Sequence, residues 1–242
     1  MNKVLNGVEN ARVYLDDVLI TTSGSYEEHL KEVAEVLKRP NDVGFHVNLK
    51  KSFFAVEELE CLGYWTTRDG MSPQTKKVEA ITKLEAPKTR RQLRHFLGMV
   101  DFCRDMWKRC SHTLAPLSAL VSAKNTCKWT EECQEAFDEI KRVMARETLL
   151  LHPDFNEEFH VHADASDKQL GGVIMQNNKP LAFYSRKLNS AQCNYAAGEK
   201  ELLSIIEVLK EFKNLLLGQK LVVHADHKNI LCRPLPTDRI MR

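Results

Sequence analysis

The sequence predicts an α/β protein whose last part is a mixed sheet. Residues 11–20 form an apolar run that two aspartates interrupt, which is typical of a β-hairpin. The middle third shows helical periodicity. After residue 153, three strand-like segments are followed by a long amphipathic helix and a further strand, an order that favours a mixed α/β sheet.

The composition is that of an ordinary globular protein. The chain has 242 residues, of which 43% are hydrophobic and 28% charged. No apolar run approaches the roughly 20 residues of a transmembrane helix, and the N-terminus does not resemble a signal peptide. The seven cysteines are scattered and form no C-x-x-C pair. We therefore expect reduced thiols in an intracellular protein that is neither secreted nor bound to a membrane.

The hairpin at residues 11–22 opens the chain. A helix is expected next, because Ser25 and Glu28 have the spacing of a capping box. Pro40 is expected to stop or kink this helix.

Two further strands and three helices follow in the pattern. Apolar and polar residues alternate at 45–49, and a second strand is expected at 61–67. Helical periodicity covers residues 72–84, 89–110 and 130–147. In the last third, strands are expected at 159–166, 171–176, 179–185 and 220–228, with a helix at 199–217.

The charge is unevenly distributed along the chain. Residues 1–73 carry a net charge of −4, residues 74–147 of +5 and residues 153–242 of +1. Aromatic residues interleave with basic ones in the helix at 89–110, which suits a nucleic-acid backbone. A solvated helix face gives the same pattern, so both interpretations remain open. The basic residues concerned are Arg90, Arg91, Arg94, Arg104, Lys108 and Arg109.

Several carboxylates stand where apolar strand residues would be expected. Asp16 and Asp17 lie at the hairpin tip, where they are either turn residues or ligands of divalent cations. Asp164 and Asp226 each lie beside alanine in a predicted strand, and Glu201 lies near the start of the helix between them. These three are either ordinary caps and turns or a metal cage.

The order of eight motifs resembles one known family. YLDD, LGY, FLG, WTEECQEAF, DAS, SRKLN, EKELL and ADHK follow one another as in the pol polyprotein of gypsy-type long-terminal-repeat retrotransposons. The resemblance runs from Val13 to Arg242. It implies three parts: the C-terminal palm of a reverse transcriptase at 1–73, its thumb and connecting helix at 74–152, and a ribonuclease H-like domain at 153–242.

The resemblance implies two metal-dependent reactions. Asp16 and Asp17 match the polymerase hairpin, and Asp164, Glu201 and Asp226 match three ribonuclease H carboxylates. All five would hold Mg²⁺ or Mn²⁺ for RNA-directed DNA synthesis and for RNA cleavage in RNA–DNA hybrids. The implied partners are an RNA template, a DNA primer and their hybrid. The implied location is a cytoplasmic particle or the nucleus.

The sequence departs from the family pattern at both ends. The family's first palm aspartate and its fourth ribonuclease H carboxylate have no counterpart here, so we expect pol segments to be missing on both sides. The alternative function is therefore that of a degenerate, nonenzymatic remnant that still binds nucleic acid. Nothing in the sequence indicates an oligomeric state.

Overall fold

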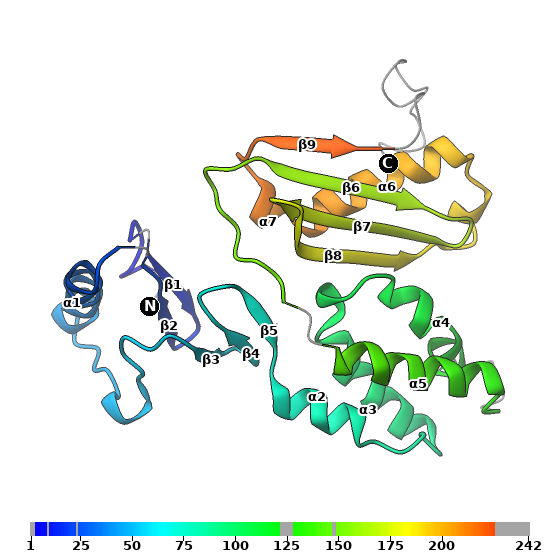
Figure 1. The fold of residues 1–242 in the computed structure, drawn as a ribbon, viewed down its shortest axis with the longest axis horizontal. Helices are drawn as coiled ribbons and strands as arrows, with labels where there is room; N and C mark the ends of the chain where they lie inside the picture. The colour runs from blue at the N-terminus through cyan, green and yellow to red at the C-terminus, as the bar shows by residue number, and fades with distance from the viewer. Residues whose placement is uncertain (1–2, 9, 23, 122–127, 147–148, 226–242) are drawn as a thin grey trace. The chain divides into compact units, whose positions relative to one another are not determined.

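The computed structural model forms two compact units (Figure 1). The first unit comprises Met1–Leu62 and Thr66–Arg68, and the second comprises Gly63–Trp65 and Asp69–Arg242. Each is described by itself, and the predicted three-part division stays a prediction. The structure describes residues 3–8, 10–22, 24–121, 128–146 and 149–225.

The first unit contains the predicted hairpin. Strands β1 (Ala11–Tyr14) and β2 (Asp17–Ile20) pair antiparallel, with Tyr14 opposite Asp17. A small apolar cluster that includes Ala11 and the helix residue Val36 lies beneath it. The interpretation of the apolar run as a hairpin is confirmed.

Helix α1 (Tyr26–Asp42) begins at the predicted capping box. Ser25 Oγ accepts the backbone N–H of Glu28, and the Glu28 carboxylate accepts the N–H of Ser25 at 2.7 Å. The helix does not stop at Pro40, which lies in its last turn. A proline there removes only one late helical bond, and its carbonyl still accepts the N–H groups of Val43 and Phe45.

The prediction of a strand at 45–49 is wrong. The segment has no strand conformation, and its apolar side chains Phe45, Val47 and Leu49 are exposed. Alternation alone does not make a strand when no neighbouring strand pairs with it, and none of the sheets in the described part of the chain includes this segment.

The segment 61–67 is not one strand, because it contains the end of one strand, a turn and the next strand. Strand β3 (Leu59–Cys61) turns at Leu62 and Gly63, whose φ angles are +52° and +83°, into β4 (Tyr64–Thr66). Strand β5 (Met71–Pro73) completes a sheet of order β3-β4-β5.

The middle of the chain is helical, as predicted, but it is divided differently. It contains α2 (Thr75–Thr82), α3 (Arg90–Asp101), the 3₁₀ turn η2 (Arg104–Met106), α4 (Cys110–Val121) and α5 (Glu131–Ala145). The prediction of a single helix at 89–110 is wrong. The Phe102 carbonyl accepts the Tyr64 hydroxyl at 2.9 Å, and Arg109 has a φ of +58°, which no right-handed helix contains.

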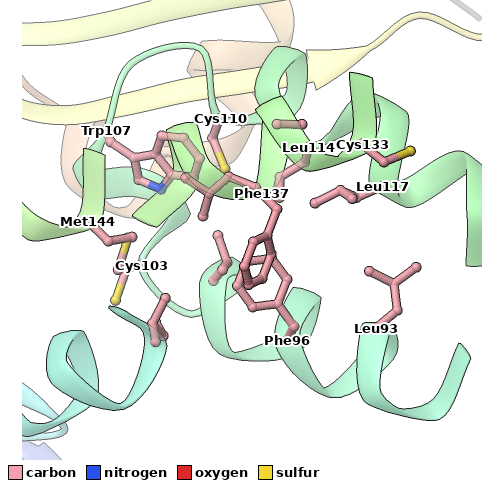
Figure 2. Packing of buried hydrophobic residues seen from close by; sticks show 14 of the residues in the cluster. Leu93, Phe96, Cys103, Trp107, Cys110, Leu114, Leu117, Cys133, Phe137 and Met144 are labelled. Atoms are coloured by element: carbon pink, nitrogen blue, oxygen red, sulfur yellow. The ribbon is translucent and has the colours of Figure 1, made fainter. Parts of the chain in front are cut away.

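These helices enclose one apolar core (Figure 2). Its centre is the contact between Phe96 of α3 and Phe137 of α5, whose ring centroids lie 4.8 Å apart. Leu117 of α4 is fully buried beside them. Three cysteines, Cys103, Cys110 and Cys133, pack into the same core as free thiols.

The last third is the predicted mixed sheet. Strands β6 (Phe159–Ala165), β7 (Gln169–Gln176), β8 (Lys179–Lys187) and β9 (Leu221–His224) have the order β8-β7-β6-β9. Strand β6 pairs antiparallel with β7 and parallel with β9. Helix α6 (Ala197–Glu211) covers one face, and the short α7 (Lys213–Leu216) follows it (Figure 1).

The sheet and α6 share a second apolar core. Phe159 and Val161 of β6 and Val208 of α6 are fully buried in it. Because side chains alternate along a strand, the odd-numbered residues of β6 face α6 and the even-numbered ones face away. None of the described helices is long and apolar enough to span a bilayer.

Candidate functional site

The hairpin tip presents both of its aspartates to solvent. Asp16 lies in the two-residue turn and Asp17 begins β2, and both side chains are exposed. Neither carboxylate makes a hydrogen bond or an ion pair to another described residue. Leu15, which precedes them, has a φ of +51°, a strained conformation for a branched side chain. Such strain is common at functional sites, where the surrounding structure holds it in place.

The charge of the hairpin affects the pKa of a nearby cysteine. Burial raises the pKa of the Cys61 thiol in β3, and the negative charge of Asp17 raises it further. The thiol therefore stays protonated at neutral pH and is a poor nucleophile.

Asp164 and Glu201 belong to a strand and a helix that are joined by a side-chain hydrogen bond. Asp164 is the penultimate residue of β6 and is exposed, and Glu201 lies in the second turn of α6. Ser204 Oγ of α6 donates to the Asp164 carbonyl at 3.0 Å and to the Gly171 carbonyl at 2.8 Å. The start of α6 is thus fixed against the end of β6.

The two neighbouring glutamates of α6 have different environments. The Glu199 carboxylate accepts the N–H of Ala196 at 2.9 Å and so serves the helix N-terminus. Glu201 Oε2 is buried and has no hydrogen-bond partner among the described residues. A buried carboxylate oxygen without a donor is costly. It is the environment in which a bound cation would compensate the charge.

The strand alternation places Asp164 on the face of β6 that also carries His160 and His162, away from α6. Glu201 belongs to the helix on the other face. Their side chains can therefore approach each other only at the end of the strand, where Asp164 lies. The predicted third carboxylate, Asp226, lies outside the described residues, two positions after the last residue of β9. Within the described ranges, no group of three His, Cys, Asp or Glu side chains is arranged to hold a metal ion.

A histidine cluster on β6 and β9 was missed at the sequence level. His160 Nδ1 lies 3.0 Å from His224 Nε2, and the His162 and His224 rings stack with centroids 4.1 Å apart. Burial, and then the charges of His224 and His160, lower the pKa of His162. The His-x-His spacing at 160–162 was visible in the sequence, but the contact with His224 required the parallel pairing of β6 with β9.

The six predicted basic residues do not form one uniform surface. Arg91 and Arg94 are exposed on α3, Lys108 and Arg109 are exposed after it, and Arg90 is half-buried. Arg104 lies 3.8 Å from Asp101 and 3.6 Å from Asp105, which offset its charge. Arg91 and Arg94 are therefore the best placed of the six to meet a phosphate backbone.

Two family models match this chain. Residues 1–66 match "Reverse transcriptase (RNA-dependent DNA polymerase)" and residues 129–223 match "RNase H-like domain found in reverse transcriptase". The first match contains the hairpin with Asp16 and Asp17, and the second contains Asp164 and Glu201.

Two curated relatives of this chain are transposon polyproteins. The chain is 34% identical to the "Retrovirus-related Pol polyprotein from transposon 297" of Drosophila melanogaster, across 94% of this chain and 22% of the relative. It is 31% identical to the "Transposon Tf2-3 polyprotein" of Schizosaccharomyces pombe, across 96% of this chain and 18% of the relative. The chain thus spans about a fifth of the length of these relatives.

Solved structures of a viral reverse transcriptase are similar to this chain. The foamy viral protease-reverse transcriptase in complex with an RNA/DNA hybrid is similar with a TM-score of 0.84 and 26% identity, across 97% of this chain and 33% of that one. The same viral protein in complex with dsDNA gives a TM-score of 0.81 at 26% identity, across 98% of this chain and 51% of that one.

Proposed function

We propose that the chain is a polymerase segment of a reverse transcriptase followed by the RNase H-like domain of that family, and that it serves RNA-directed DNA synthesis and RNA cleavage in RNA–DNA hybrids. The observation that carries the cleavage function is the buried, unpartnered Glu201 oxygen in a helix bonded to the backbone of Asp164. It supports a site that a divalent cation completes.

The proposed metal ligands are the carboxylates at the two sites. Asp16 and Asp17 would hold Mg²⁺ or Mn²⁺ at the hairpin tip, and Asp164, Glu201 and Asp226 would hold it at the sheet. Hard carboxylate oxygens suit these ions. At the sheet site, such a metal would lower the pKa of an attacking water and would stabilise charge on the leaving oxygen.

The protein's own contribution is to place these carboxylates. At the hairpin, a two-residue turn carrying the strained Leu15 holds Asp16 clear of the β1–β2 ladder. At the sheet, the bonds from Ser204 fix the helix that carries Glu201.

Metal binding by the purified chain tests the cleavage site. We expect Mn²⁺ to raise the melting temperature, because binding to the folded state alone stabilises it. Asp164→Asn should reduce this rise to what the hairpin carboxylates contribute, and it should abolish any cleavage of a labelled RNA–DNA hybrid. The matched control is Glu157→Gln, which changes an exposed carboxylate two residues before β6 begins. A melting temperature that does not change with Mn²⁺ would favour the alternative that the chain is a nonenzymatic remnant.

We further propose that α3 contacts the phosphates of the hybrid through Arg91 and Arg94. The double variant Arg91→Glu/Arg94→Glu should weaken binding and reduce the salt dependence by about one unit of slope for each phosphate that is no longer bound. The double variant Lys179→Glu/Lys213→Glu makes the same charge change at exposed lysines of the sheet part. Equal weakening by both pairs would assign the effect to net charge instead of to α3.

A further inference from the structure

Ser204 is the most buried polar side chain in the described part of the second unit. Its exposed fraction is 0%, and its Oγ reaches both the Asp164 carbonyl and the Gly171 carbonyl. A serine hydroxyl has a single proton, so the two carbonyls share it. The side chain thus joins α6 to β6 and β7 at the same point.

This point lies between the two described members of the proposed metal site. Glu201 precedes Ser204 by three residues, so both lie on the same side of α6. The residue whose carbonyl accepts the hydroxyl is Asp164 itself. One buried hydroxyl therefore connects the helix of one proposed ligand to the backbone of the other.

A second contact at this helix end joins a buried lysine to an exposed aspartate. Lys200 Nζ lies 3.0 Å from Asp167 in the turn after β6, but the Asp167 side chain is 97% exposed. Solvent screens such a pair and weakens its hold on the helix. The buried contact of Ser204 is therefore the stronger constraint on where α6 begins.

We propose that Ser204 is a positioning residue that sets the spacing between Asp164 and Glu201 for a divalent cation. The inference rests on the proposed function of these two carboxylates. The Ser204 hydroxyl itself does not touch the metal. Without it, both carbonyls lose a donor and the first turns of α6 can shift relative to the end of β6. Losing a partner that orients a metal ligand typically weakens metal binding tenfold or more.

The test is Mn²⁺ affinity of the folded chain, measured from the electron paramagnetic resonance signal of the free ion. Wild type, Ser204→Ala and Ser204→Cys are compared at a temperature at which all remain folded. The matched control is Val208→Ala, which shortens a fully buried side chain one turn later on the same helix, where it lies next to Gly172. We expect both Ser204 variants to bind Mn²⁺ about tenfold more weakly than wild type. The Val208 variant should melt earlier but bind like wild type.

Each other outcome overturns the inference in a recognisable way. If both Ser204 variants bind Mn²⁺ like wild type, Ser204 is only structural and the proposed function stands. If Val208→Ala loses as much affinity, general loosening of the helix explains the effect. If the wild-type chain itself binds no Mn²⁺, the proposed function fails and this inference fails with it. Should Ser204→Ala not fold, Ser204→Cys decides, because it fills the same space with a much weaker donor.

Discussion

Gly172 lies where helix α6 packs against the sheet. A Cβ added there would lie 2.4 Å from Val208 Cγ2 and 3.3 Å from the His162 carbonyl oxygen. The first distance is far below a normal van der Waals contact, so Val208 or the helix must move. Overpacking of this kind costs about 1–3 kcal/mol. Replacing glycine by alanine also removes freedom from the unfolded chain, which returns about 0.4–1 kcal/mol.

The expected net loss for Gly172→Ala is therefore about 1–2 kcal/mol in the free energy of unfolding. For a chain of this size, it corresponds to a melting temperature lower by roughly 3–6 °C. Gly171→Ala is the matched control, because its added Cβ meets only the Asp164 carbonyl oxygen, at 3.9 Å. Neither glycine has a positive φ, so backbone strain does not distinguish the two. Urea unfolding followed by circular dichroism measures both, and equal stabilities would refute the close approach of α6.

Three further predictions concern the helical core and its contacts. Thr89→Ala removes the capping box of α3 and should cost about 1 kcal/mol in urea unfolding, whereas an unchanged midpoint would show that the box contributes nothing. Tyr64→Phe keeps the ring stack with Phe102 but loses the bond to its carbonyl, so we expect a loss of about 1 kcal/mol. A variant as stable as wild type would show that the bond adds nothing. Burial raises the pKa of the Cys110 thiol and of the Tyr64 hydroxyl, each to about 12, from ordinary values of 9.0 and 10.0. Because the unfolded chain loses these protons first, the contribution of these two groups to the free energy of unfolding should be constant below about pH 9 and fall as the pH rises toward 12. Melts at pH 8 and pH 10.5 that agree would contradict this.

Local signals in the sequence predicted the parts of the fold that local interactions determine. The capping box at Ser25 and the hairpin around Asp16 depend on residues close to one another in the chain. The order of strands and helix after residue 153 was enough to predict the mixed sheet, because a strand that follows a helix can return parallel to the first strand.

The errors lie where distant contacts decide. The helix expected at 89–110 is interrupted near Phe102, whose carbonyl binds a tyrosine 38 residues earlier in the chain. The alternation at 45–49 had no strand to pair with. At the candidate site, the residue types and motif order indicated Asp164 and Glu201. The buried oxygen of Glu201 and the connecting role of Ser204 became visible only once α6 was packed on the sheet.

The parallel pairing of β6 with β9 has a consequence for the order of folding. Strands β6, β7 and β8 are neighbours in sequence and can pair as soon as they are made, whereas β9 must close a loop of about sixty residues to reach β6. Strand β9 is also short and lies at the edge of the sheet that the described residues form. Amide hydrogens of Leu221–His224 should therefore exchange with solvent faster than those of β6 and β7. A metal site that needs both β6 and the residues after β9 would be assembled last. Its cation would therefore stabilise the product of the final folding step.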